Sequence, residues 1–232
     1  GGESDTGTSS GYGGLVIYNG NAAGAKPELS QNIEIGTKWN ILDDKLLLTA
    51  AAFQTTKKDV MEGADYDAVG TFNTGKNRVH GIELGLVGNV TEKFTLQAGV
   101  AFMKSKVLNS ATASNVGNPL SNFADRTMSI QGKYQLTPAL AIGATARHES
   151  NRCGGQPDTG AGYTATGVCS QPVPAFTVYD LFASYRVNKH LDFRLNVLNA
   201  ANKDYYTAVY RSGAFLYKGD ARAVRVTVNY DL

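Results

Sequence analysis

The sequence has little charge, no long apolar run and no marked excess of one sign of charge. Asp, Glu, Lys and Arg make up 18% of its 232 residues, against roughly 25% in soluble domains. A net charge of +2 leaves no basic face large enough for a phosphate backbone, so nucleic acid is not expected as a partner. The best apolar run, residues 46–53, is interrupted by Thr49. It is far shorter than the roughly 18 residues that suggest a membrane helix, which excludes a helical span.

Alternation of apolar and polar residues is the dominant pattern. A period of two residues is typical of strands with two different faces, and a helical period is almost absent. In residues 31–40, for example, Ile33, Ile35 and Trp39 share one face, and Glu34 and Lys38 share the other. About nine strands of roughly ten residues are expected, so the fold class is all-β and antiparallel. They lie near residues 31–40, 45–57, 80–90, 94–102, 127–134, 140–147, 179–186, 191–197 and 221–232.

Connection lengths distinguish a membrane barrel from a soluble sandwich, which also has alternating strands. The joins at residues 42–44, 91–93, 136–138 and 188–190 are short. Those at residues 60–76, 107–122, 151–174 and 210–219 are long and polar. Short turns that alternate with long loops are typical of outer-membrane β-barrels, with turns in the periplasm and loops outside the cell. We therefore predict a multi-pass transmembrane barrel in the bacterial outer membrane.

Aromatic residues support the same interpretation. Trp and Tyr favour membrane interfaces, where the ring contacts lipid and the polar atom contacts water. Five aromatic residues fall at the short-turn ends of their predicted strands: Trp39, Phe94, Tyr134, Tyr185 and Tyr230. We predict that they form a periplasmic girdle.

An odd number of strands suggests part of a larger barrel. Bacterial single-chain barrels have an even number of strands, and an open edge in lipid would leave backbone groups unpaired. The first predicted strand ends in a short turn, so the chain starts outside the cell. We expect residues 1–29 to be an extracellular Gly/Ser-rich loop segment and residues 30–232 to be the C-terminal portion of the barrel. Residues 1–14 lack the basic and apolar regions of a signal peptide.

Several motifs, taken in order, resemble TonB-dependent siderophore receptors. They are Lys26-Pro27-Glu28-Leu29-Ser30, Glu34-Ile35-Gly36-Thr37-Lys38-Trp39, Gly81-Ile82-Glu83-Leu84, Tyr179-Asp180-Leu181, and Leu195-Asn196-Val197-Leu198-Asn199 with Lys203, Tyr205 and Tyr206. Residues 210–215 and 219–222 resemble the end of catecholate-type receptors in particular. One departure is Leu232, where the family usually has an aromatic residue.

The resemblance implies a plugged barrel of about 22 strands, of which this chain would hold the last nine or so, with the plug domain absent from the chain. It implies TonB-dependent uptake of an iron(III)–siderophore complex, with no bound cofactor and no enzymatic activity. The TonB complex would act through the plug, and outer-membrane lipid and lipopolysaccharide would surround the wall. Lumen-facing polar residues would then contact the plug or its water layer: Glu34, Lys38, Glu83, Gln97, Lys133, Asp180, Arg186, Asp192 and Arg194.

Both cysteines, Cys153 and Cys169, lie in the long connection at residues 151–174. A loop assembled in the oxidising periplasm favours a disulfide between them. No His or carboxylate lies nearby at ligand spacing, which disfavours a metal site.

A siderophore complex is large, often anionic and aromatic, so its receptor needs Arg or Lys for charge and aromatic rings for stacking. We expect Tyr205, Tyr210 and Arg211 at the top of the penultimate strand. The candidate ligand-binding residues are Arg147, Arg152, Tyr205, Tyr210, Arg211, Phe215, Tyr217 and Lys218, with Tyr66, Phe72, Lys76 and Tyr163 as weaker candidates. For any one of them, contact with lipopolysaccharide, the bilayer rim or solvent is an open alternative.

Two other functions share some of these features. A passive porin or small barrel would have the same strand pattern without an upstream plug. An outer-membrane hydrolase would need catalytic groups on one rim, for example His148 with Glu149 or with Asp180. The sequence has no GxSxG, HExxH or phosphate-loop motif, so no catalytic residue is predicted.

Overall fold

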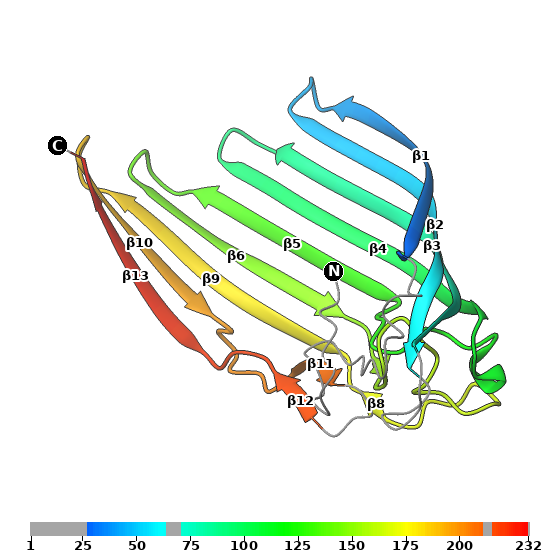
Figure 1. Ribbon diagram of the computed structural model, residues 1–232. Coiled ribbons are helices and arrows are strands. Elements are labelled where there is room, and N and C mark those ends of the chain that lie inside the picture. Colours follow the sequence, from blue (N-terminus) through cyan, green and yellow to red (C-terminus); the bar gives the residue numbers. More distant parts are fainter. Residues whose placement is uncertain (1–26, 64–70, 211–214, 232) are drawn as a thin grey trace.

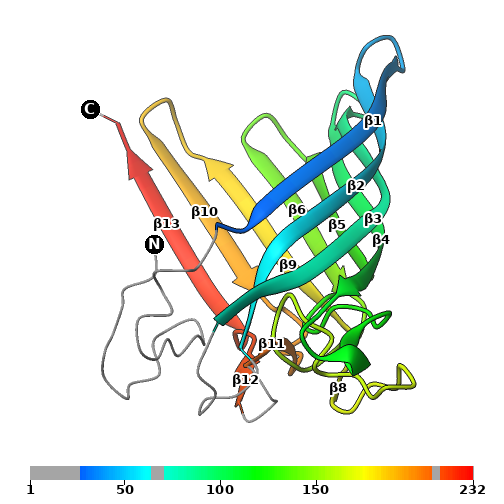
Figure 2. The same cartoon turned by 45° about the vertical axis from the view of Figure 1, so that its right-hand side comes forward.

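The structure is a computed structural model that describes residues 27–63, 71–210 and 215–231. Nine strands form one antiparallel sheet in the order β1-β2-β3-β4-β5-β6-β9-β10-β13, which curves into an open trough (Figures 1 and 2). The strands are β1 (Leu29–Ile41), β2 (Leu46–Gly63), β3 (Thr71–Asn89), β4 (Phe94–Asn109), β5 (Arg126–Gln135), β6 (Leu140–Glu149), β9 (Phe176–Arg186), β10 (Leu191–Leu198) and β13 (Ala223–Tyr230). The predicted all-β antiparallel fold is confirmed.

Three smaller elements lie in the connections. They are the 3-10 turn η2 (Ala113–Asn115), the pair β7 (Arg152–Cys153) and β8 (Pro172–Val173), and the pair β11 (Tyr206–Tyr210) and β12 (Phe215–Lys218). Among the described residues, no helix has the length and apolar character needed to span a membrane.

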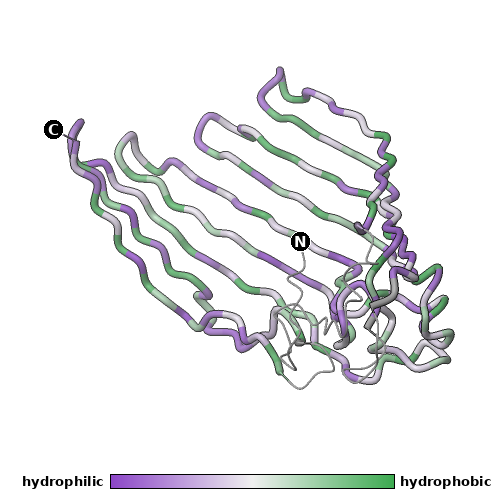
Figure 3. The backbone as a smooth tube through the Cα atoms, viewed as in Figure 1, coloured by the Kyte–Doolittle hydropathy of each residue, from purple (hydrophilic) through white to green (hydrophobic). Residues whose placement is uncertain are grey.

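Strand register separates the sheet into two chemically different faces. Residues paired across neighbouring strands share a face, because side chains alternate along each strand. One row on the face that we call the outer face is Trp39, Leu48, Leu86, Ala98, Ile130, Ala146 and Tyr179. The adjacent row, on what we call the lumen face, is Lys38, Thr49, Gly85, Gly99, Ser129, Arg147 and Val178. Figure 3 shows the alternation along the strands.

The polar residues predicted to face the lumen all lie on the lumen face. Arg186 pairs with Asp192 and Arg194 with Thr227, and the remaining members fall in the same set of rows. The outer face leaves large apolar side chains exposed, among them Ile35 and Val226. Exposure of so many apolar side chains on one face is the arrangement expected for a wall in contact with lipid.

The four short turns are confirmed, but three strands are much longer than predicted. β2, β3 and β4 contain 18, 19 and 16 residues, rather than about ten. β2 and β3 pair as far as Gly63 and Thr71, so the connection predicted at residues 60–76 is much shorter. Towards the loops the outer-face positions of these strands become polar, for example Lys104 and Lys106 in β4, which interrupts the alternation that marks a strand in the sequence.

The aromatic residues predicted for the periplasmic girdle lie next to the short turns, on the outer face. Phe94 pairs with Tyr134, Tyr185 pairs with both Leu140 and Phe193, and Trp39 and Tyr230 lie near the corresponding ends of β1 and β13. These positions are consistent with rings at a membrane interface.

The final long connection differs from the prediction. β10 ends at Leu198, and the β11–β12 hairpin occupies the middle of the segment that joins it to β13. The long connection therefore begins about ten residues before the predicted start at residue 210, because the apolar-polar alternation of β10 stops at Leu198. Of the predicted extracellular segment 1–29, residues 1–26 lie outside the described residues.

Candidate functional site

Three long connections meet at the end of the sheet opposite the short turns (Figure 1). They are the described parts of residues 110–125, 150–175 and 199–222, which we call the loop layer. Long connections face the outside of the cell in outer-membrane barrels, so the loop layer is the surface that an extracellular ligand meets first.

Asn122 joins the three parts of the loop layer. Its Nδ2 donates to the carbonyl oxygens of Gly155 (2.7 Å) and Val209 (2.6 Å), and its Oδ1 accepts from the backbone N–H of Val209 (2.9 Å). Its own N–H donates to the carbonyl oxygen of Cys153. A left-handed φ of +56° at Asn122 is tolerated better by Asn than by most residues. Its bonds reach two other segments, residues 153–155 and Val209.

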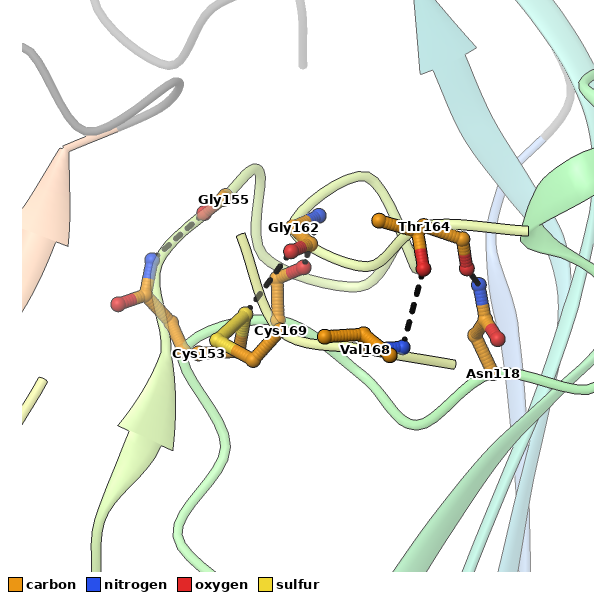
Figure 4. The surroundings of a disulfide bond; sticks show 9 residues. Asn118, Cys153, Gly155, Gly162, Thr164, Val168 and Cys169 are labelled. Atoms are coloured by element: carbon orange, nitrogen blue, oxygen red, sulfur yellow. Dashed lines mark hydrogen bonds between the residues drawn. A yellow bond between two sulfur atoms is a disulfide. The ribbon is translucent and has the colours of Figure 1, made fainter. Parts of the chain in front are cut away.

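The predicted disulfide is confirmed. Cys153 and Cys169 are bonded, with a Cα–Cα distance of 5.6 Å, and the backbone around them is tightly packed (Figure 4). A Cβ added to Gly162 would lie 1.9 Å from the carbonyl oxygen of Gly154, so only glycine fits there. Asn118 links this loop to the β4–β5 connection, because its Nδ2 donates to the carbonyl oxygens of Ser114 and Thr164.

Charged and polar side chains attach the loop layer to the strand ends opposite the short turns. Lys57 Nζ lies 2.6 Å from Glu28 Oε2 and 2.9 Å from Asp158 Oδ2, and Asn77 Nδ2 donates to the carbonyl oxygen of Asp158. Burial by itself raises the pKa of Glu28, but hydrogen bonds from Lys57 and the Met61 N–H outweigh burial and hold that pKa below its ordinary value. The bridge therefore keeps Glu28 ionised and joins the start of β1 to β2 and to the disulfide loop.

Glu62 plays a similar part between β2 and the β4–β5 connection. Its buried carboxylate accepts hydrogen bonds from Thr74 Oγ1, Ser110 Oγ and the N–H of Ala111. Three donors compensate for the loss of water around the charge.

Two of the predicted ligand-binding residues, Arg152 and Tyr205, are buried and contact other residues of the protein. Arg152 is 9% exposed, and its guanidinium pairs with Glu149 and donates to the carbonyl oxygen of Thr207. Tyr205 is also 9% exposed and lies beyond the penultimate strand, with its ring centroid 4.6 Å from that of Phe176. The expected placement of Tyr205 at the top of that strand is wrong, because the connection folds back over the lumen face of β9. These contacts give both side chains a structural role.

The β11–β12 hairpin carries the exposed aromatic residues. Phe215 is 66% exposed and Tyr217 is 55% exposed. They alternate with Leu216, which pairs with Val209, and Val209 is buried against Gly154. Phe215 and Tyr217 therefore lie on the hairpin face opposite to the one that packs against Gly154 of the disulfide loop. Tyr206, which the sequence analysis did not single out as a ligand-binding residue, is also exposed on this hairpin.

Lys218 lies at the end of the same hairpin and pairs with Asp204, with Nζ 2.7 Å from Oδ1. The hydrogen bond from Lys218 holds the pKa of Asp204 below its ordinary value, and the same bond raises the pKa of Lys218. Both side chains are exposed, so the pair stabilises the fold little. Lys218 is accessible to an anionic ligand.

Arg147 lies on the lumen face of β6, where its Nη2 is 3.6 Å from Asp180 Oδ2. About half of the Arg147 side chain is exposed. His148, the next residue, faces the opposite way and its Nδ1 lies 2.9 Å from Thr177 Oγ1 on the outer face. Glu149 and Asp180 belong to lumen-face rows, so His148 does not converge with either of them as a hydrolase site would require.

The remaining candidates are not gathered in one place. Lys76 pairs with Lys58 in an outer-face row, so it lies on the face opposite the lumen. Tyr163 lies in the disulfide loop, where burial, and then the nearby Asp125 carboxylate, raises the pKa of its hydroxyl. Arg211 and Tyr66 lie outside the described residues, and for Tyr210 and Phe72 only the backbone is described.

Comparison with known proteins places this geometry in a family. The model described as "TonB dependent receptor-like, beta-barrel" matches residues 4–200. The chain belongs to the TonB-dependent receptor family. Its members are outer-membrane receptors and transporters, which agrees with the two-faced sheet, and this family is not one of enzymes.

Curated relatives of this receptor chain include siderophore receptors. It is 39% identical over 200 residues to the probable TonB-dependent receptor BfrD of Bordetella pertussis, covering 84% of the chain and 26% of the relative. It is 31% identical to the probable TonB-dependent siderophore receptor PiuA of Acinetobacter baumannii (91% and 28%). It is 33% identical to the catecholate siderophore receptor Fiu of Escherichia coli (88% and 26%). The receptor chain thus spans about a quarter of the length of these relatives.

Solved structures of two of these proteins have the same fold. The closed form of the ferric-catecholate import receptor Fiu from E. coli superposes with a TM-score of 0.72 at 30% identity, covering 93% of the receptor chain and 30% of Fiu. The siderophore receptor PiuA of A. baumannii gives 0.71 at 30% identity, with 87% and 28% covered. The family resemblance inferred from the sequence motifs is confirmed.

The sequence analysis did not identify Asn122 and Glu62, whose hydrogen bonds hold the parts of the loop layer in place. The only local signal for Asn122 is its residue type in a loop, since Asn is common where the backbone is left-handed. Its partners are as far as 87 residues away, which no sequence pattern indicates.

Proposed function

We propose that this chain forms part of the wall and extracellular mouth of a TonB-dependent transporter for ferric catecholate siderophores. The observation that carries the proposal is the exposed hairpin with Phe215, Tyr217 and Lys218, held at the mouth by Asn122. One relative, Fiu of E. coli, is named as a catecholate receptor both in its curated sequence and in its solved structure, which supports this ligand class.

The chemistry of the hairpin suits such a ligand. An iron(III) tris-catecholate complex is anionic and presents aromatic rings at its surface. Phe215 and Tyr217 offer rings for offset stacking, and Lys218 offers charge. Arg147 on the lumen face would meet the complex further along the path. The iron is cargo held by the siderophore, so the receptor needs no metal ligands of its own.

The wall by itself supplies no free energy for transport. We propose that the TonB complex acts on a plug outside this chain to open the path, as the family resemblance implies. In this scheme the lumen-face polar residues contact the plug or its water layer.

Binding of radiolabelled iron(III) complexed by 2,3-dihydroxybenzoate to the full-length receptor in detergent tests the proposal. The double variant Phe215→Ala with Tyr217→Ala should bind about tenfold more weakly, since each ring stack contributes roughly 0.5–1.5 kcal/mol. Tyr185→Ala, an exposed aromatic residue on the outer wall, is the matched control and should bind normally. A wild-type receptor that prefers a ferric trihydroxamate would contradict the ligand class.

Arg211 is the second position to test. It lies beside the hairpin in the sequence, outside the described residues. Arg211→Ala should weaken ferric catecholate binding while the barrel still assembles, and unchanged affinity would argue against its role.

A further inference from the structure

The outer face changes character at the extracellular end of β3, β4 and β5. Ile82, Phe102 and Arg126 form one row by register. The next outer-face row towards the loops contains His80 and Lys104, and the row above it contains Arg78 and Lys106. We call Arg78, Lys104, Lys106 and Arg126 the outer cationic patch. Arg126 lies level with Ile82 and Phe102, the uppermost members of the apolar band here, and the other three cations lie above that band.

The cations of the patch lack ion-pair partners within the described part of the chain. None of its four cations forms an ion pair there, although Arg147, Arg194 and Lys57 on the lumen face all do. Arg78 Nε is buried without a hydrogen-bond partner among the described atoms. The Asp125 carboxylate lies within electrostatic range of two of these cations: burial raises its pKa, and the charges of Arg126 and Lys104 oppose that rise.

A hollow of about 590 Å³ connects the charged and apolar parts of this surface. Its wall includes Ile82 and Phe102 as well as His80, Lys104, Asp125 and Arg126. Successive outer-face residues on a strand are about 7 Å apart, so Lys104 lies one such step above Phe102. This step matches the headgroup region, which extends roughly 5–7 Å beyond the hydrocarbon core on each side of a bilayer.

We propose that the outer cationic patch binds the phosphate groups of a phosphorylated glycolipid in the outer leaflet. Lys104 and Arg126 contact phosphate at the hollow, Lys106 and Arg78 extend the contact away from the membrane, and acyl chains lie against Ile82 and Phe102. Continuity with the apolar band favours a lipid over a soluble anion, because the band places the patch at the depth of lipid headgroups. Basic residues at this depth each attract anionic lipid.

Native mass spectrometry of the full-length receptor with diphosphorylated lipid A tests the proposal. The double variant Lys104→Gln with Arg126→Gln should bind lipid A at least about tenfold more weakly than the wild type. The matched control, Lys38→Gln with Lys133→Gln, removes two cations from the lumen face and should keep wild-type binding. Heat-modifiable migration on gels verifies that both variants are folded barrels.

Two further probes distinguish the source of the phosphate and the role of charge. Dephosphorylated lipid A should bind the wild type weakly and the patch variant equally weakly. Inorganic pyrophosphate should not compete at concentrations similar to those of lipid A. The proposal is overturned if the patch variant retains lipid A, if the lumen control loses it equally, or if pyrophosphate displaces it at equal concentration.

Discussion

Replacing Asn122 with glycine should release the loop layer while leaving the barrel wall intact. Glycine adopts the left-handed φ of +56° found at this position without strain, so the variant isolates the three side-chain hydrogen bonds to Gly155 and Val209. Each bond contributes about 1 kcal/mol net, and Val209 is only 3% exposed, so water does not readily replace them. The expected loss is about 3 kcal/mol, or roughly a 100-fold increase in local opening.

Amide hydrogen exchange on the full-length receptor in detergent measures this opening. Exchange should accelerate in β11 and around Cys153, and should be unchanged in β4 and β5. Asn202→Gly is the matched control, because Asn202 also has a left-handed φ of +50° but its side chain accepts a single bond of 3.2 Å from the Arg222 N–H. The reasoning is refuted if Asn122→Gly changes exchange less than about threefold, or accelerates it equally in the wall strands.

Three other perturbations test separate parts of the account. Replacing Cys153 and Cys169 together by serine should destabilise the disulfide loop by roughly 3 kcal/mol, seen as faster proteolysis of that loop with the barrel still heat-modifiable; equal protease resistance would contradict this. Because the folded-state pKa of Glu28 is lowered from 4.5, its bridge stabilises the fold above that pH and is lost as the pH falls below it. Glu28→Gln should therefore accelerate amide exchange at the start of β1 at neutral pH and have no effect in acid; a difference that persists in acid would refute the bridge. Ala144→Arg, on the outer face, should cost roughly 2–4 kcal/mol in lipid, whereas Thr145→Arg on the lumen face should be tolerated, as refolding into vesicles would measure; equal costs would contradict the face assignment.

The faces of the wall were predictable because lipid and lumen impose opposite chemistry on alternate residues. In β4, Leu96, Ala98 and Val100 alternate with Gln97 and Gly99, so the sequence alone assigned each to its face. The short turns were equally clear, since each interrupts two alternating runs. Both predictions depend only on neighbours in the sequence.

The architecture of the mouth was not predictable in this way. Beyond Phe102 the outer-face positions of β4 become Lys104 and Lys106, so the regular alternation of apolar and polar residues ends there although the strand continues to Asn109. Tyr205 has the composition of a ligand-binding residue but packs on Phe176, and a Cβ on Gly219 would collide with its ring. Such burial depends on a loop folding back on a distant strand, which local propensity does not encode.

The central claim is that one face of each strand contacts lipid and the other faces an enclosed lumen. Nitroxide labels placed singly at residues 96–102 of the full-length receptor in vesicles, with collision rates measured for oxygen and for a water-soluble nickel chelate, test it most directly. The account predicts high oxygen accessibility at 96, 98, 100 and 102 and low oxygen accessibility at 97, 99 and 101. Equal accessibility along the strand, or chelate contact at 98 and 100 as high as for a label in free solution, would contradict it.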